Sequence, residues 1–197
     1  MADTGWIAVI GAGAAIGGGL ITGAFDLIRD WFSRPQLKLE YSGGDDCKVE
    51  STWESKGQTE TQIFVRVRLS NSGKRIARDC KVYLVGLTEV SNSTEHKTNF
   101  YDSMELSWPG YPQNFESRSV PSGIDMYANL VSVSKNQSGW RFQVKQMYAS
   151  QGNLKAYKGT YRFRLLAIAD NAAPAELFVD VHYDQDWHSL RACEAKV

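Results

Sequence analysis

Two hydrophobic patterns divide this 197-residue chain. From residue 35 onward apolar and polar residues alternate, as in QIFVRVRLSN, where Ile63, Val65, Val67 and Leu69 share one face. A period of two is typical of half-buried antiparallel strands. The polar stretch over residues 42–61 predicts a long loop or a ragged hairpin. With the first strand, QLKLEY, the alternating segments number about eight and predict a mainly β, antiparallel sandwich. The others are ARDCKVYLVGLTEV, NFYDSMELSW, IDMYANLVSVSK, WRFQVKQM, YKGTYRFRLLAIAD and AELFVDVHYDQDW.

The second pattern is an uncharged stretch from Gly5 to Phe25. As a helix it rises about 31 Å, close to the ~30 Å of a bilayer core. Trp6 lies at one end and Trp31 with Phe32 at the other, and such rings collect at membrane interfaces. Pro35 disfavours helix in the residue before it. We therefore expect residues 1–34 to form a single transmembrane anchor and residues 35–197 to form the sandwich domain.

Glycine and alanine fill more than half of the apolar stretch. On a helix, Gly11, Ala15, Gly19 and Gly23 form one smooth column, and Gly13 with Gly17 adds a second pair beside it. Because glycine destabilises a helix, such a column favours close packing against another helix. We expect self-association of the anchors. A monomeric anchor with incidental glycines is the alternative, since glycine is common in membrane helices.

The charges and thiols place the domain in a cell compartment. The 22 basic and 22 acidic residues cancel, so no nucleic-acid partner is expected. Arg29, Arg34 and Lys38 follow the apolar stretch, and the positive-inside rule then places the β-domain in the cytoplasm. Three cysteines without metal spacing fit a reducing compartment.

The segment VRVRLSNSGKRIARDCKVYL joins two strands through an Asn-x-Gly turn, with a small residue after it. It resembles bacterial immunoglobulin-like sandwich domains, in which this turn joins two core strands and the small residue packs beneath it. The resemblance covers about twenty residues and implies a fold without an activity.

Three groups of residues are candidates for chemistry. The first is the run DVHYDQDWH, in which alternation puts Asp180, His182, Asp184, Asp186 and His188 on one face. Imidazole and carboxylate groups are ligands for zinc or manganese. The alternative is the polar outer face of a last strand. The weak metal-site candidate is His182, Asp184, Asp186 and His188, and no cofactor is expected.

The second group is basic. Arg66 and Arg68 lie on one strand, and Arg162 and Arg164 on another. If those strands are neighbours, the four guanidiniums form an anion site. Alternatively they belong to a solvated face and pair with acids such as Glu60 and Glu176.

The third group is the aromatic loop that holds Trp108, Tyr111 and Phe115. Aromatic rings on a stiff, proline-containing loop are able to recognise a partner protein or touch a membrane. The alternative is a loop that folds back and plugs the sandwich.

These patterns give three functional hypotheses. The preferred one is a non-enzymatic, single-pass anchored sandwich that self-associates and binds a partner or small ligand. The second is a structural subunit of a filament or shell with the apolar helix in its core. The third is a metal-dependent enzyme, although no catalytic motif is present.

Overall fold

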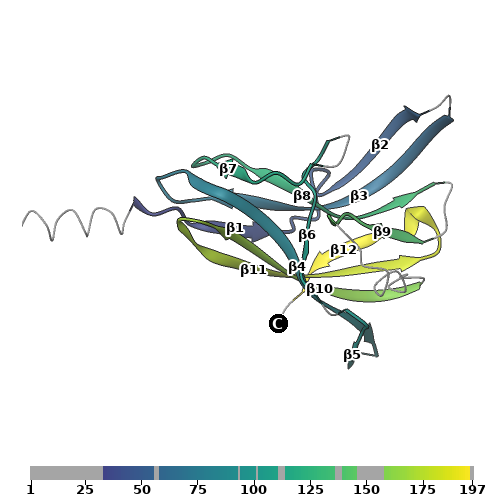
Figure 1. Cartoon of the computed structure of the whole chain (residues 1–197). Coiled ribbons are helices and arrows are strands. Elements are labelled where there is room, and N and C mark those ends of the chain that lie inside the picture. Colours follow the sequence, from purple (N-terminus) through teal and green to yellow (C-terminus); the bar gives the residue numbers. More distant parts are fainter. Residues whose placement is uncertain are drawn as a thin grey trace, which may run out of the picture.

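The computed structural model describes residues 33–55, 58–92, 94–100, 102–110, 114–135, 139–145 and 158–195. These residues form two antiparallel β-sheets packed as a sandwich, so the mainly β class is confirmed (Figure 1). Residues 1–32 of the predicted anchor, with Trp6, Trp31, Phe32 and the glycine column, lie outside the described ranges. Within those ranges no helix has the length and apolar character needed to cross a membrane.

One sheet has five strands in the order β1-β3-β8-β9, with β2 also paired to β3. Its strands are β1 (Leu37–Glu40), β2 (Lys48–Ser55), β3 (Gln58–Asn71), β8 (Met126–Ser134) and β9 (Trp140–Phe142). β1 pairs with the last residues of β3 and β2 with the first ones, so both lie along the same edge of that strand. Residues 41–47 form the loop that interrupts this edge.

The other sheet has seven strands in the order β12-β11-β10-β4-β5, with β6 and β7 also paired to β4. Its strands are β4 (Ala77–Ser91), β5 (Thr94–Lys97), β6 (Met104–Glu105), β7 (Arg118–Val120), β10 (Lys158–Ala169), β11 (Ala172–Asp184) and β12 (Arg191–Glu194). The short 3-10 helix η2 (Trp187–Ser189) precedes β12.

The core lies between the two sheets and follows the predicted alternation. Val65, Val67 and Leu69 of β3 are fully buried, and they face a layer that includes Phe163 and Leu165 of β10. Burying an aliphatic or aromatic side chain of this size stabilises the fold by about 1.5–3 kcal/mol. The intervening polar residues therefore lie on the outer faces of the sheets.

Both long edges of the sandwich are joined across the sheets. At one edge, Leu106 donates its amide to Val82 O of β4 at 2.8 Å, and Ser107 donates to Gln143 O at 2.8 Å. At the opposite edge, Gln36 forms a β-bridge with Ala173 of β11.

The described residues form twelve strands, where the sequence pattern predicts about eight. Within the polar stretch over residues 42–61, β2 pairs with the first residues of β3 as a hairpin, and β5, β7 and β12 were not predicted. All four residues of β5 are exposed, so that strand carries no apolar alternation. The strand predicted over residues 99–108 is reduced to Met104–Glu105 and isolated bridges.

The chain enters the sandwich through a tight set of contacts around Asn71, whose side chain is buried. Asn71 Oδ1 accepts hydrogen bonds from Gln36 N and Gly73 N, each at 3.0 Å. Its Nδ2 group donates to Arg75 O at 2.7 Å and to Val120 O at 3.0 Å. All four hydrogen-bonding positions of this amide are therefore used.

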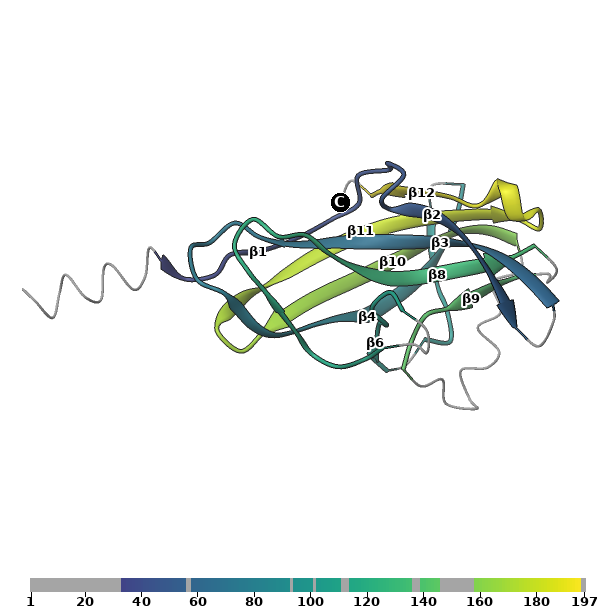
Figure 2. The same ribbon diagram turned by 90° about the horizontal axis from the view of Figure 1, so that it is seen from above.

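The turn that follows Asn71 packs closely against residues 34–36 of the entering chain. A Cβ atom on Gly73 would lie 2.2 Å from Arg34 O and 2.6 Å from Pro35 Cα, so no side chain fits there. Arg75 N also donates to Ser33 O at 3.1 Å. We call residues 33–36 together with residues 71–75 the entry clasp. It fixes the direction in which residues 33–36 approach the sandwich (Figure 2).

Candidate functional site

The C-terminal histidine and aspartate run does not converge on one point. β11 ends at Asp184, so Asp186 and His188 leave the strand, and the prediction of five residues on one strand face is wrong. Asp186 caps η2 by accepting from His188 N at 3.1 Å. Asp184 pairs with Lys158 at 2.8 Å, and Thr160 Oγ1 lies 3.0 Å from His182 Nδ1. Within the described ranges no three His, Cys, Asp or Glu side chains are grouped as a metal site requires.

The ring of Trp108 is buried, with 2% of the residue exposed. Its Nε1 donates to Glu116 O at 2.8 Å, so the ring is held by the following loop. Trp108 is therefore not an exposed platform, and the alternative of a loop that folds back describes it. Phe115 is half-buried, and Tyr111 lies outside the described residues.

The two arginine pairs lie in different sheets, so the adjacency needed for a four-arginine site is not met. Arg162 of β10 forms a bidentate pair with Asp180, at 2.7 and 2.8 Å, and also contacts Glu95 of β5. These carboxylates raise the pKa of the Arg162 guanidinium, first through the Asp180 hydrogen bonds. Arg164 pairs with Glu176, as the alternative prediction had it. This outer face is thus neutralised by its own acids.

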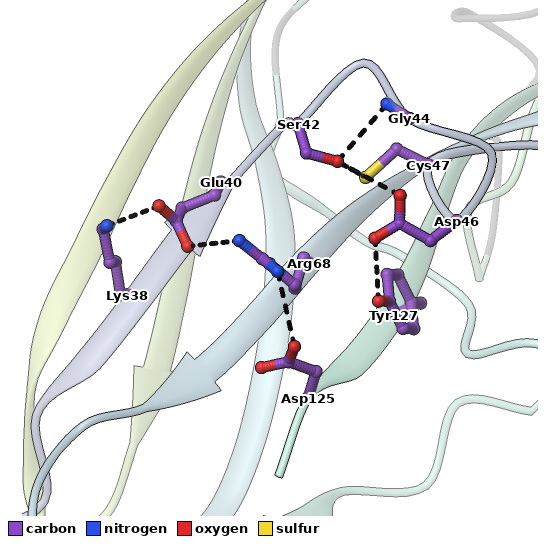
Figure 3. Close-up of polar contacts among 9 residues, drawn as sticks. All are labelled: Lys38, Glu40, Ser42, Gly44, Asp46, Cys47, Arg68, Asp125 and Tyr127. Carbon is purple, nitrogen blue, oxygen red and sulfur yellow. Dashed lines mark hydrogen bonds and ion pairs between the residues drawn. The ribbon is translucent and has the colours of Figure 1, made fainter. Parts of the chain in front are cut away.

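Arg68 of β3 is also neutralised. Its Nη2 donates to Glu40 at 3.0 Å, and its Nη1 donates to Asp125 at 3.4 Å (Figure 3). Lys38 contacts the other oxygen of Glu40. The hydrogen bond from Lys38 is the main cause that lowers the pKa of Glu40, with Arg68 adding to it. The row Lys38, Glu40, Arg68 and Asp125 balances two positive against two negative charges.

Arg66 is the exception among the four predicted arginines. Its Nε donates to Asn129 Oδ1 at 2.9 Å, and its Cζ lies 5.5 Å from the centroid of the Phe64 ring. No carboxylate of the described residues lies within ion-pair distance of it. Burial lowers the pKa of this guanidinium, since its charge is removed from water without a counter-charge. An anion bound there would supply that missing charge.

The surroundings of Arg66 on the outer face of the five-stranded sheet are polar. Ser132 is the cross-strand neighbour of Phe64, and Arg141 of β9 is the next neighbour on the same row. Gln143 Nε2 donates to Ser132 Oγ at 2.8 Å. We call Arg66, Phe64, Asn129, Ser132 and Arg141 the Arg66 face. It combines two guanidinium groups, one aromatic ring and polar side chains.

Next to this face, the loop 41–47 is held by a small hydrogen-bond network. Tyr127 OH donates to Asp46 at 2.9 Å, and Ser42 Oγ donates to the other Asp46 oxygen at 3.1 Å (Figure 3). The Tyr127 hydrogen bond is the main cause that lowers the pKa of Asp46. Tyr41 is buried beside this loop, and its burial raises its pKa to about 12. Cys47 is fully buried, so its thiol is out of reach of a substrate.

Sequence reasoning did not find the polar residues buried on this outer face. Asn129, Ser132 and Ser134 are all less than 5% exposed, and they alternate with buried apolar residues along β8. The segment NLVSVS carries that alternation, but small polar residues are ordinarily assigned to solvent. Only their hydrogen bonds, such as Ser134 Oγ to Glu60 at 3.1 Å, show that the face is ordered.

Comparison of the chain with family models, curated proteins and solved structures found no match.

Proposed function

We propose that the chain is a non-enzymatic, single-pass membrane-anchored module whose β-sandwich lies in the cytoplasm. Residues 1–34 are the anchor, and residues 35–197 are the domain that it carries. The observation that supports this best is the entry clasp, because the chain arriving from the apolar segment is bound tightly at one end of the sandwich. Only residues 26–32 separate Phe25 from the clasp. The domain is thus mounted on the anchor through a short connection.

We propose further that the anchors associate through the column of Gly11, Ala15, Gly19 and Gly23. Small residues allow close backbone approach, which drives association where lipid removes the hydrophobic effect between helices. Residues 1–34 then determine the oligomer, and the sandwiches are arranged by it.

The ligand of the sandwich is proposed to be anionic and to bind at the Arg66 face. Arg66 is half-buried and has no carboxylate partner among the described residues, whereas Arg68, Arg162 and Arg164 each have one. A phosphate or carboxylate group is the chemistry that this guanidinium recognises best.

Membrane retention of the full chain tests the anchor. We expect the protein to stay with membranes through an alkaline carbonate wash and to need detergent for release. Ile10→Lys with Ile16→Lys should abolish retention, since each central lysine costs about 2.5–3.5 kcal/mol on insertion. The control Ile10→Leu with Ile16→Leu should be retained. Release of the unmodified chain by carbonate as a regular soluble assembly would instead favour the filament or shell subunit.

The oligomer in detergent tests the glycine column. Gly19→Leu with Gly23→Leu should reduce the oligomer mass measured by light scattering. At 100° per residue, Ala14 and Ala24 lie about 120° and about 160° from the centre line of the column, so they face away from it. The matched control Ala14→Leu with Ala24→Leu should therefore leave the mass unchanged. Equal effects of the two pairs would contradict the column.

Inorganic phosphate is the probe for the Arg66 face. At ten times its Kd and constant ionic strength, phosphate should raise the unfolding midpoint by about 3–5 °C. Arg66→Gln should remove this shift, whereas Arg164→Gln, whose guanidinium is already paired, should keep it. A shift that survives Arg66→Gln would refute this site.

A further inference from the structure

Several loops meet at the end of the sandwich where the chain enters. Gly123 N of the β7–β8 connection donates to Asn71 O at 3.1 Å. Asn171 of the β10–β11 turn donates its Nδ2 to Ile76 O at 3.0 Å and accepts from Arg78 N at 2.9 Å. The views of Figures 1 and 2 agree that these loops and the start of β1 lie at one end. We call residues 33–36, 71–78, 121–125 and 168–171 the entry end.

The entry end holds the large hydrophobic side chains that the described residues expose. Ile76 is 50% exposed, Ile124 is 51% exposed, and Ile168 is 37% exposed. Ile76 and Ile124 lie in loops, where no strand alternation forces them outward. Apolar side chains gathered on one exposed surface mark a contact with a partner or a membrane.

The same surface is rich in basic side chains. Arg34, Lys74, Arg75 and Arg78 are all exposed there. Two neighbouring acids already have partners. Asp125 forms an ion pair with Arg68, and Asp79 accepts a hydrogen bond from Ser117 Oγ at 2.8 Å. Asp170 is exposed as well. The balance of exposed charge at the entry end is therefore positive.

We propose that the entry end rests on an anionic lipid surface. Ile76 and Ile124 lie in the interfacial layer, and the basic side chains lie among the headgroups. Exposed isoleucines flanked by lysine and arginine suit this boundary, because lipid takes up the apolar chain while headgroups neutralise the charge. The partner is a lipid leaflet and not a second protein.

The inference rests on the proposed anchoring, which also determines the occupant of this surface. The seven residues 26–32 span at most about 25 Å even when fully extended. If residues 5–25 span the bilayer, the entry end stays within that distance of the headgroups. It is also the end that faces them, because the clasp fixes where the chain arrives.

Site-specific fluorescence in reconstituted vesicles tests the proposal. The full chain with Cys193→Ser receives one new cysteine, Ile76→Cys or Ile124→Cys, and an environment-sensitive label. The native Cys47 and Cys80 are buried and stay unlabelled. Thr94→Cys is the matched control, since it is exposed on β5, far from the entry end in Figure 1. Vesicles of phosphatidylcholine with phosphatidylglycerol carry a quencher on the lipid chains.

We expect the labels at 76 and 124 to lose about half of their emission to the lipid quencher, and the label at 94 to lose almost none. The effect should weaken in pure phosphatidylcholine and in Lys74→Gln with Arg78→Gln. Equal quenching at 76, 124 and 94 would overturn the proposal. Protection from an aqueous quencher without lipid quenching would also overturn it, in favour of contact with a second copy.

A carbonate wash of the same vesicles separates this inference from the anchoring. Protein that stays in the vesicles while labels at 76 and 124 remain unquenched leaves the anchor intact and refutes only the lipid contact. Protein released by the wash refutes both.

Discussion

Replacing Asn71 is the sharpest test of how this fold is held at its entry. Asn71→Ala removes the four hydrogen bonds from Gln36, Gly73, Arg75 and Val120 at once. Each is worth about 1 kcal/mol net, and buried groups left without a partner add to the loss. Because Asn71 is 1% exposed, water has little access to replace it. We expect the free energy of unfolding to fall by about 4 kcal/mol.

Asn171 offers a matched control at the same end of the molecule. Its side chain makes two hydrogen bonds, with Arg78 N and Ile76 O, but it is exposed. Water replaces these bonds when the amide is removed, so Asn171→Ala should cost about 1 kcal/mol or less. The two variants differ mainly in burial.

Asn71→Asp tests the two hydrogen bonds that the Asn71 Nδ2 group donates separately from the two that its Oδ1 atom accepts. The aspartate keeps an oxygen for the two amides, but its second oxygen faces the carbonyls of Arg75 and Val120. That contact raises its pKa in the folded state above the unfolded value of about 3.9. The unfolded chain then releases its proton first as pH rises, so the defect is largest at neutral pH and shrinks as pH falls towards 4.

Urea unfolding of the full chain in a mild detergent, followed by tryptophan fluorescence, measures all three variants. Equal losses for Asn71→Ala and Asn171→Ala would refute the reasoning, since burial would then not decide the cost. A pH-independent defect of Asn71→Asp would show that the two carbonyls do not face its carboxylate.

Two further predictions use the same unfolding assay. Gly73→Ala should lower the free energy of unfolding by more than about 2 kcal/mol, because the added Cβ meets backbone atoms. Gly123 has φ +72° and open space around it, so Gly123→Ala should cost only about 1–2 kcal/mol of backbone strain. Equal costs would contradict the close approach at Gly73. Tyr41 has its pKa raised from 10 to about 12, so its contribution to stability is complete below pH 10 and is lost between pH 10 and about 12. Comparison with Tyr41→Phe across that range should isolate a loss of up to about 2.7 kcal/mol, and identical pH profiles would show that Tyr41 is ionised as readily when folded.

The sequence pattern located the central strands because each of them buries one face. Ile63 to Leu69 and Val179 to Tyr183 alternate as predicted, and the core follows from them. The sequence pattern did not predict several strands at the margins of the sheets, because these strands do not bury one face in the same way. β5 is exposed throughout, so it has no apolar face to detect.

The candidate site shows a different limit of prediction from the sequence. The sequence named four arginines, but the acids that neutralise three of them lie 12 to 67 positions away. Only strand register brings Glu40 opposite Arg68 and Asp180 opposite Arg162. Arg66 stands apart because its cross-strand neighbour is Asn129. A pattern of single residues does not contain that information, since pairing depends on which strands meet and where each is bulged.

The tight entry also has a consequence for the proposed assembly. A flexible linker would let each sandwich turn freely on its anchor. Here, turning residues 33–36 against the domain would break the bonds of Asn71 and separate Gly73 from Pro35. If anchors associate through their glycine column, each sandwich therefore keeps a fixed orientation relative to its own residues 33–36. A ligand at the proposed Arg66 face would then act on such an assembly through whole domains, because the clasp leaves little freedom between the sandwich and residues 33–36.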